Sequence, residues 1–367
     1  MRRLLAILIL LAAWPLPGSA ENEESVTVGV ATVLTGDLAV LGKNISMTVE
    51  TYRRHYLRHP IRFVFEDSKL NGADGLRAYQ KLLSVDHPDM LIAASSSNGT
   101  LAASGLINSS KTPAISVVTG GRGIDHAGPF IFRIGNSDTL NGLQEAEEFK
   151  REGKARVAVL TEETEYTQDI ENAFVPKFKE LGGEVVLQQS FPPGTADYRS
   201  HVTALRSAAP DGIFFLSQTG TSLALFLKQW REQKGKSVSI HTTFVAAPNA
   251  EAHAIAGDAI YNVAFMAPSY DRENAELKQF LQHYRADHGV DPAIAFHTAA
   301  IVDSLNLLQR YLDGGTEYSR EGFQTFLVTK VKDYAGLMGK YSIDEDGNAN
   351  IGFTRATIER KNATSLQ

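Results

Sequence analysis

Two kinds of apolar pattern alternate along the first two thirds of the chain. Short runs rich in Val, Ile and Phe, beginning with 26–31, are followed by longer stretches whose apolar residues recur at i, i+3 and i+4. Strands separated by helices of about 10–15 residues indicate βαβ units, with a parallel sheet covered by helices on both faces. The strands are expected at 26–31, 61–66, 89–93, 114–118, 156–160, 184–187, 212–216, 239–242 and 259–266.

The rhythm restarts near residue 139, which predicts two similar α/β units and not one long sheet. Three helices without strands follow, at 273–288, 293–312 and 320–330, and a β-like tail at 339–343 and 351–359 is expected to turn as a hairpin at 344–348. Helices without strands of their own must pack on sheets already formed, so the chain is expected to return to the first unit and then cross again. The predicted lobes are 21–134 with 268–339, and 135–267 with 340–367.

The first twenty residues have the pattern of an export signal. Arg2 and Arg3 precede an apolar run over 4–14, and Gly18-Ser19-Ala20 ends on small residues suited to signal peptidase. The run is too short for a membrane anchor, which needs about 20 apolar residues. We therefore expect cleavage after Ala20 and a soluble protein exported to the periplasm of a bacterium.

Composition narrows the chemistry. Apolar residues make up 43% of the chain and charged residues 21%, which is typical of a globular protein. The net charge is −6 and no basic stripe is present, so nucleic acid is not an expected partner. The chain has no cysteine, which rules out disulfides, thiol catalysis and zinc–thiolate sites.

Motifs for catalysis or for metal binding are weak. The start of a calcium loop at Asp344 lacks the glutamate required at the twelfth position, which Arg355 occupies. His55 and His59 have i, i+4 spacing but no glutamate of the metalloprotease pattern between them. No nucleophile elbow, dinucleotide loop or recognisable acid/base pair is found. No metal and no cofactor is expected.

Polar residues after the predicted strands are more informative. In open α/β sheets, ligands bind in the crevice beyond the carboxyl ends of the strands. The run Ser95 to Thr100 follows one such strand and begins a helix, so it offers hydroxyls and free N–H groups to a carboxylate, although plain N-capping would need only one of its residues. The segments 161–166 and 217–219 are expected to face this run across a cleft.

Several segments in order resemble the type I periplasmic solute-binding proteins of ABC transporters, specifically the leucine/isoleucine/valine-binding branch. The likeness covers residues 26–360. The segments that carry it are Thr35 to Gly42, Phe65 to Ser68, Ser96-Ser97, Pro113 to Ser116, Phe132-Arg133-Ile134, Asp197-Tyr198, Pro210 to Phe215 and Phe296 to Leu308.

The resemblance implies two Rossmann-like lobes joined by three hinge crossings that close on a ligand. It places Ser97, beside Ser96, at the ligand carboxylate through its hydroxyl and N–H. It places a tyrosine, here Tyr166, against the ligand. The other residues that it implies at the site are Val118, Thr119 and Gly120 of a second carboxylate-binding loop, Gln218 where an aromatic residue is common, and Ala246.

One departure bears on the ligand. Amino-acid binders commonly have an acid that pairs with the ligand ammonium after the strand that here contains Thr242, but this chain has Val245-Ala246-Ala247 there. Glu251 lies further on, and the loop glutamates Glu162, Glu163 and Glu165 could replace the acid. Two ligand classes therefore stay open: a branched-chain or other amino acid, and an amine-free organic or aromatic acid.

The leading hypothesis is a non-catalytic, monomeric periplasmic receptor that delivers a small carboxylate-bearing solute to the permease subunits of an ABC importer. The first alternative is a sensor of the same fold that presents its ligand state to a signalling partner. The second is an exported hydrolase, which would need a serine and a histidine joined in a pair that no motif indicates.

Overall fold

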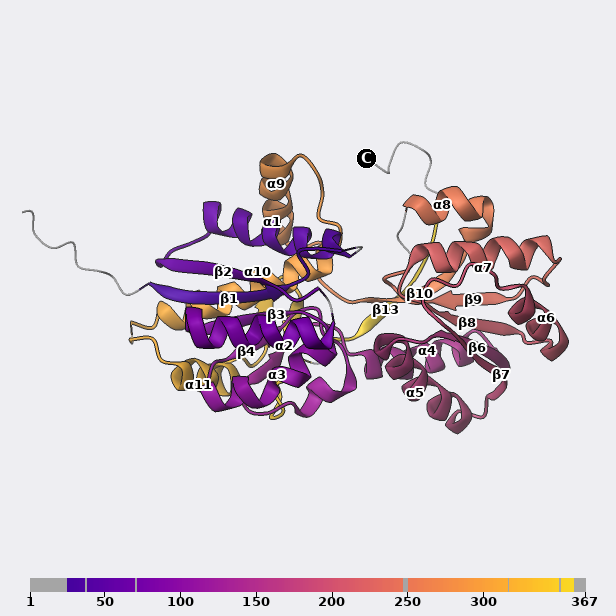
Figure 1. Cartoon of the computed structure of the whole chain (residues 1–367), viewed down its shortest axis with the longest axis horizontal. Coiled ribbons are helices and arrows are strands. Elements are labelled where there is room, and N and C mark those ends of the chain that lie inside the picture. Colours follow the sequence, from indigo (N-terminus) through magenta and orange to yellow (C-terminus); the bar gives the residue numbers. More distant parts are fainter. Residues whose placement is uncertain are drawn as a thin grey trace, which may run out of the picture.

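The computed structural model describes residues 25–36, 38–69, 71–246, 250–315, 317–349 and 351–359, with the side chains at 250 and 251 outside this description. The predicted signal, residues 1–20, lies outside the described residues. Figure 1 shows two α/β units side by side along the long axis, with extended segments running between them. None of the helices in the described part of the chain combines the length and the apolar character needed to cross a bilayer.

The first unit contains a parallel five-stranded sheet in the order β2-β1-β3-β4-β5. Helices α2 and α3 pack on one face, while α1, α9, α10 and α11 contribute to the core on the other. Its elements are β1 (Val26–Thr32), α1 (Ala39–His55), β2 (Ile61–Asp67), α2 (Gly72–Lys81) with a π-helical extension (Leu82–Asp86), β3 (Met90–Ala94), α3 (Ser97–Ser110), β4 (Ala114–Ser116), a 3₁₀ helix (Arg122–His126), β5 (Ile131–Arg133), α9 (Ala275–His288), α10 (Ala295–Leu312), α11 (Arg320–Lys330), β11 (Tyr334–Gly336) and β12 (Gly339–Tyr341).

The second unit contains a six-stranded sheet in the order β13-β10-β9-β8-β6-β7, parallel except for β13. Its two faces are covered by α4 with α5 and by α6 with α7 and α8. Its elements are α4 (Asp138–Arg151), β6 (Arg156–Glu162), α5 (Glu165–Glu180), β7 (Glu184–Phe191), α6 (Arg199–Ala208), β8 (Gly212–Leu216), α7 (Gly220–Glu232), β9 (Ser239–Thr242), α8 (Ala250–Ala256) with a 3₁₀ extension (Gly257–Ile260), β10 (Ala264–Pro268) and β13 (Phe353–Thr357). The predicted fold class, two doubly wound α/β lobes, is confirmed.

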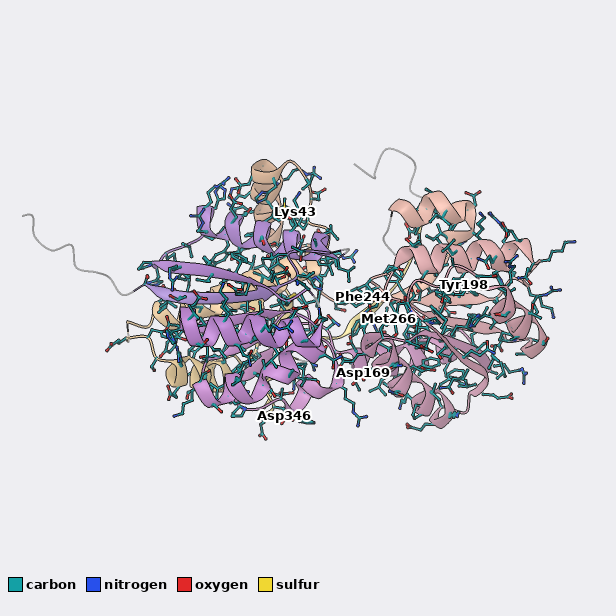
Figure 2. The ribbon with its side chains drawn as sticks, in the orientation of Figure 1. Lys43, Asp169, Tyr198, Phe244, Met266 and Asp346 are labelled. Carbon is teal, nitrogen blue, oxygen red and sulfur yellow. The ribbon has the colours of Figure 1, made fainter. Side chains whose placement is uncertain are left out.

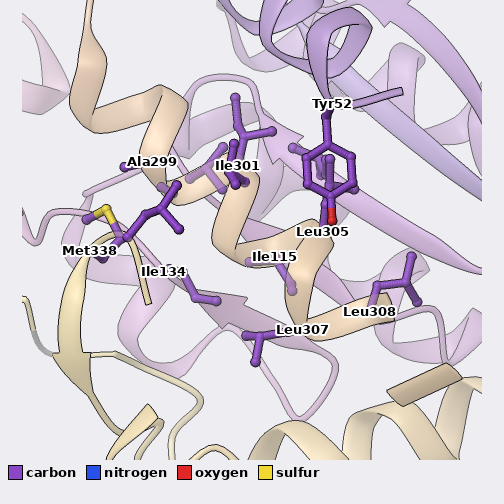
Figure 3. Close-up of a cluster of buried hydrophobic side chains, with 14 of the residues drawn as sticks. Tyr52, Ile115, Ile134, Ala299, Ile301, Leu305, Leu307, Leu308 and Met338 are labelled. Atoms are coloured by element: carbon purple, nitrogen blue, oxygen red, sulfur yellow. The ribbon is translucent and has the colours of Figure 1, made fainter. Parts of the chain in front are cut away.

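The three helices without strands return to the first sheet because α10 is apolar on most of its circumference. Ile301, Leu305 and Leu308 are buried with Tyr52 of α1 in one cluster, drawn in Figure 3. A helix that is apolar all round is stable in water only when other elements surround it. The first lobe is therefore built from two stretches of the chain that are far apart in the sequence.

The tail differs from the sequence prediction. The segments 339–343 and 351–359 do not form a hairpin with each other: β12 pairs with β11, and β13 pairs antiparallel with β10 of the other sheet. Tyr341, Ile343 and Ile351 still lie in the core of the first sheet. We therefore propose that the third passage between lobes lies between Ile351 and Phe353, later in the chain than residue 339.

Candidate ligand-binding site

In the turn after β3, Ser96 and Ser97 make different hydrogen bonds. Ser96 is the N-cap of α3, and its Oγ accepts from the Gly99 N–H at 3.0 Å. Ser97 begins the helix, and its Oγ accepts from the Gly121 N–H at 3.1 Å. Capping therefore occupies Ser96 alone, and the Ser97 hydroxyl lies between the α3 N-terminus and the glycine loop.

The loop after β4 lies against that serine. Val118 is half-buried, and Thr119 is buried and bonded to Ser116, whose Oγ donates to the Thr119 carbonyl at 3.1 Å. A Cβ on Gly120 would lie 2.3 Å from Asp138 Oδ1, so this approach of backbone to carboxylate requires glycine. The loop is therefore packed between Ser97 of the first lobe and Asp138 of the second.

Carboxylates of the second lobe accept hydrogen bonds from backbone N–H groups of the first lobe. The Arg122 N–H donates to Asp169 Oδ2 at 2.8 Å, and the Asn98 N–H donates to the carboxylate of Glu165. Figure 2 shows Asp169 on the side of the second unit that faces the first. Both contacts lie within a residue or two of Ser97 and Gly120, so the two lobes meet at the place where the sequence predicts ligand binding.

Asp138 lies at the candidate site, and sequence reasoning missed it. Its side chain is buried beside Asn136, whose Nδ2 donates to Oδ1 at 3.0 Å. Burial, followed by the charge of Asp169, raises the pKa of Asp138 well above its usual range, and Arg133 and Asn136 only partly oppose this. Burial likewise raises the pKa of Glu165. The available signal was the position of Asp138 at the first turn of α4, directly after the first crossing.

Tyr166 belongs to an apolar wall of the second lobe. Its ring meets that of Phe244 edge to face, with centroids 6.5 Å apart and an interplanar angle of 89°. Met266 and Phe353 complete the buried part of this cluster, and Val245 packs against it. Figure 2 labels Phe244 and Met266 close to the junction of the units. Val245, which stands where an acid was expected, thus extends an apolar surface.

Gln218 and Ala246 are placed differently. The Gln218 N–H donates to Glu162 Oε2 at 2.6 Å. Glu162, which was expected in a loop, is therefore the buried end of β6 and holds the turn after β8. Ala246 is fully buried in the core under α7 and α8, and its N–H donates to the Thr243 carbonyl at 3.2 Å. The described structure therefore groups Ser97, Thr119 and Gly120 with Asp138, but it does not group the Ala246 side chain with them. Ala247 and the Glu251 side chain lie outside the described residues.

The family of the chain follows from a match to its whole described length. A sequence model described as "periplasmic binding protein" matches residues 25–362. The chain belongs to the periplasmic binding protein family.

Relatives within the family are distant in sequence. The Leu/Ile/Val-binding protein homolog 6 of Brucella melitensis is 18% identical over 343 residues, which are 92% of this chain and 88% of that protein. Among solved structures, the leucine-binding protein LivK of Thermotoga maritima has a TM-score of 0.77 at 22% identity, with 91% of this chain and 99% of that chain covered. A solute-binding protein of an ABC transporter from R. palustris, in complex with 4-hydroxybenzoate, has a TM-score of 0.80 at 20% identity, with 92% and 94% covered.

A separate cavity of about 280 Å³ lies beside the contact between the lobes. It is lined by Arg122 of the first lobe and by residues of α4 and α5 that include Thr139, Asp169 and Lys177. None of the predicted site residues lines it. Among the described residues, no three His, Cys, Asp or Glu side chains are grouped so as to hold a metal ion.

Proposed function

We propose that this periplasmic binding protein is the substrate-binding component of an ABC importer and that it holds a small carboxylate-bearing solute between its two lobes. The observation that carries the proposal is the arrangement of Ser97 against the Gly121 N–H, at the N-terminus of α3. A helix N-terminus presents N–H groups and partial positive charge, which favour an anion. The proposed donors to the ligand carboxylate are the Ser97 hydroxyl and the N–H groups near it.

The protein's own acids support this assignment. Glu165 and Asp169 place carboxylate oxygens on the N–H groups of Asn98 and Arg122, immediately beside the proposed position of the ligand carboxylate. These N–H groups therefore point out of the first lobe and can donate hydrogen bonds to a carboxylate. A ligand that binds at Ser97 would sit between these contacts and the apolar wall at Tyr166.

The ligand class depends on where an ammonium could be paired. Val245 offers no charge, and its neighbours Phe244 and Tyr166 are aromatic. Three acids, Asp138, Glu165 and Asp169, lie around the loop after β4, and the pKa of Asp138 and of Glu165 is raised, which favours the neutral form of each. This arrangement supports a solute without an amine, such as an aromatic or keto acid, over an α-amino acid.

The remaining parts of the proposal concern cellular context. Residues 1–20 would direct export and be cleaved after Ala20, and the closed, loaded protein would dock as a monomer on the permease subunits in the inner membrane. The partner is a small molecule and not a nucleic acid. The family supports this role, since its members are solute-binding proteins.

The test is binding to a defined panel. The purified mature protein is titrated by calorimetry with leucine, isoleucine, benzoate and 4-hydroxybenzoate, and native mass spectrometry is used to detect any small molecule that co-purifies. Saturable binding of one carboxylate, weakened by Ser97→Ala and not by Ser109→Ala on the exposed face of the same helix, supports the proposal. Binding that is insensitive to Ser97→Ala would overturn the site assignment, and turnover of a ligand would overturn the non-catalytic role.

A further inference from the structure

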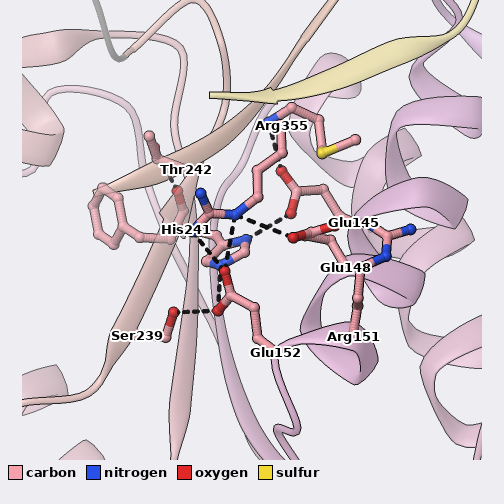
Figure 4. Close-up of polar contacts among 10 residues, drawn as sticks. Glu145, Glu148, Arg151, Glu152, Ser239, His241, Thr242 and Arg355 are labelled. Atoms are coloured by element: carbon pink, nitrogen blue, oxygen red, sulfur yellow. Dashed lines mark hydrogen bonds and ion pairs between the residues drawn. The ribbon is translucent and has the colours of Figure 1, made fainter. Parts of the chain in front are cut away.

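A buried charged network lies in the second lobe where the connecting segments reach it (Figure 4). The His241 side chain on β9 is 1% exposed, with Nδ1 2.8 Å from Glu145 Oε2 and Nε2 3.2 Å from Glu152 Oε2. Its ring also stacks on Phe149, with centroids 4.0 Å apart. All three partners belong to α4 or its C-cap. The imidazole is therefore held by side chains of the first helix after the first crossing.

The same two glutamates hold the strands of the other two crossings. Glu145 Oε1 accepts from the Met266 N–H of β10 at 2.9 Å, and Glu152 Oε1 accepts from Arg355 of β13 at 3.0 and 2.7 Å. Met266 and Arg355 lie opposite each other in the β10–β13 pair. One network therefore contacts the second-lobe end of every crossing.

On the side of β9, the Met266 N–H has no strand to bond to, and the Glu145 carboxylate takes the place of that strand. The pairing of β10 with β9 stops at Phe265, because β9 ends at Thr242. A buried N–H beyond that point needs another acceptor, and Glu145 supplies it. Three glutamates, at 145, 148 and 152, thus converge from one helix, and such a group needs buried positive charge to offset their repulsion and desolvation.

We propose that His241, as an imidazolium between Glu145 and Glu152, is a positioning residue for ligand binding, which fixes β10 and β13 to α4 so that the second-lobe wall moves as one body. That wall is the apolar cluster in which Met266 and Phe353 pack with Tyr166 and Phe244. The inference rests on the proposed function, since it concerns closure of the lobes on a solute.

Titration of the network agrees with this geometry. Burial alone would favour a neutral ring, but Glu145 and Glu152 outweigh it and raise the pKa of His241 to about 9. The bond from His241, with Ser239 and Arg355, holds the pKa of Glu152 well below its usual range. The other charged or titratable groups around the network are Glu148 with Arg151 on α4, Arg355 on β13, and Tyr166 on α5, whose raised pKa reflects burial first and also Glu145. His241 therefore loses its charge as pH rises through about 9, and Arg355 is then the cation that remains on Glu148 and Glu152.

The test measures lobe geometry without ligand, so its outcome is independent of whether the solute is found. Because the chain has no cysteine, spin labels are placed cleanly at Lys43→Cys and Lys236→Cys, which are exposed positions in the first and second lobes. Interlobe distances are then measured by pulsed dipolar spectroscopy between pH 7 and pH 10. The expected distribution is narrow at pH 7 and broadens with a midpoint near pH 9.

Two variants test whether the charge of His241, and not only the presence of its side chain, positions the lobes. His241→Gln is expected to give the broad distribution at both pH values, and Glu152→Gln, which keeps a hydrogen bond but removes a charge, to lower the midpoint by about one pH unit or more. His201→Gln, on α6 of the same lobe, serves as the matched control and should behave as the parent. A pH response that persists in His241→Gln, or a midpoint unmoved in Glu152→Gln, would overturn the proposal. Should His241→Gln not fold, the shift in Glu152→Gln decides alone.

Discussion

The Arg122 N–H and the Asp169 carboxylate join the two lobes through a hydrogen bond of 2.8 Å. Arg122 follows Gly121, whose own N–H donates to Ser97, so the contact between lobes and the predicted carboxylate site share one short loop. A solute bound at Ser97 would therefore lie beside the contacts that hold the lobes together. We therefore expect ligand binding and lobe closure to be coupled through this loop.

Ser97→Ala should weaken binding of the preferred carboxylate by about tenfold or more, since a hydrogen bond to a charged group contributes about 1.5–3 kcal/mol. Calorimetric titration of both proteins measures the change. Ser109→Ala, whose hydroxyl donates to a backbone carbonyl on the exposed side of α3, is the control and should bind as the parent does. Equal affinity of the Ser97 variant and the parent, with the fold intact, would contradict the carboxylate assignment.

Gly120→Ala should lower the free energy of unfolding by about 1–3 kcal/mol, the usual cost of overpacking a tight site. The new Cβ would lie 2.3 Å from Asp138 Oδ1 and 2.5 Å from Asn136 Nδ2. Urea unfolding followed by circular dichroism measures the change. Gly105→Ala in α3 is the control, because nothing lies within 4 Å of its Cβ position and alanine is the better helix former. Unaltered stability of the Gly120 variant would show that Asp138 does not need to approach the loop.

Ligand should compact the protein, because two lobes joined by three segments close by bending at those segments. Small-angle scattering with and without a saturating solute should show a smaller radius of gyration in the bound form. Ser97→Ala at the same solute concentration should remain closer to the free form. Superimposable curves for free and saturated protein would argue for a rigid cleft.

Asp303 should make stability fall as pH rises from about 4 to about 7. It is buried on α10 and accepts from the N–H groups of Leu337 and Met338 at 2.7 and 3.0 Å. Burial outweighs these bonds and raises its pKa to about 7. The folded state then binds the proton more tightly than the unfolded state, so stability is fullest below the unfolded pKa and falls by up to about 4 kcal/mol as pH passes 7. Unfolding in urea across this range should show a smaller fall in Asp303→Asn than in the parent, because Asp138 and Glu165 also have raised pKa values and remain in both proteins; parallel profiles would exclude the assignment.

Local patterns in the sequence were enough to predict the two sheets, because buried parallel strands read as short β-branched runs between amphipathic helices. They also predicted that α10 returns to the first sheet, since helices without strands of their own must pack on a sheet that has already formed. The pairing of β13 with β10 was not predicted, because a partner so distant along the chain leaves no mark in a local pattern. The turn at 344–348 was therefore assigned to the wrong hairpin.

The same limit applied to the site. Ser97 could be proposed from the sequence because a run of hydroxyls after a strand has a local signature, whereas Asp138 and Asp169 reach the glycine loop from helices of the other lobe. Ala246 was implied by the resemblance, and its side chain lies in the core under α7 and α8. Counting residues along a chain does not fix which way a loop residue points.

The last prediction concerns the ligand amine. The protein should bind the keto acid of leucine more tightly than leucine itself, because an ammonium brought into the closed cleft loses water and costs several kcal/mol unless a fixed charge meets it. Val245 supplies none, and the raised pKa of Asp138 favours a neutral carboxyl, which can donate to a keto oxygen. A competition titration between the two compounds measures the preference. Tighter binding of leucine that is lost in Asp138→Asn or Glu165→Gln would mean that an acid from α4 or α5 pairs with the ammonium. Its loss in Glu251→Gln alone would assign that role to the segment after β9. Either result would mean that the ligand is an amino acid and not an amine-free acid, because an acid that pairs with the ammonium offsets its cost wherever that acid lies in the chain.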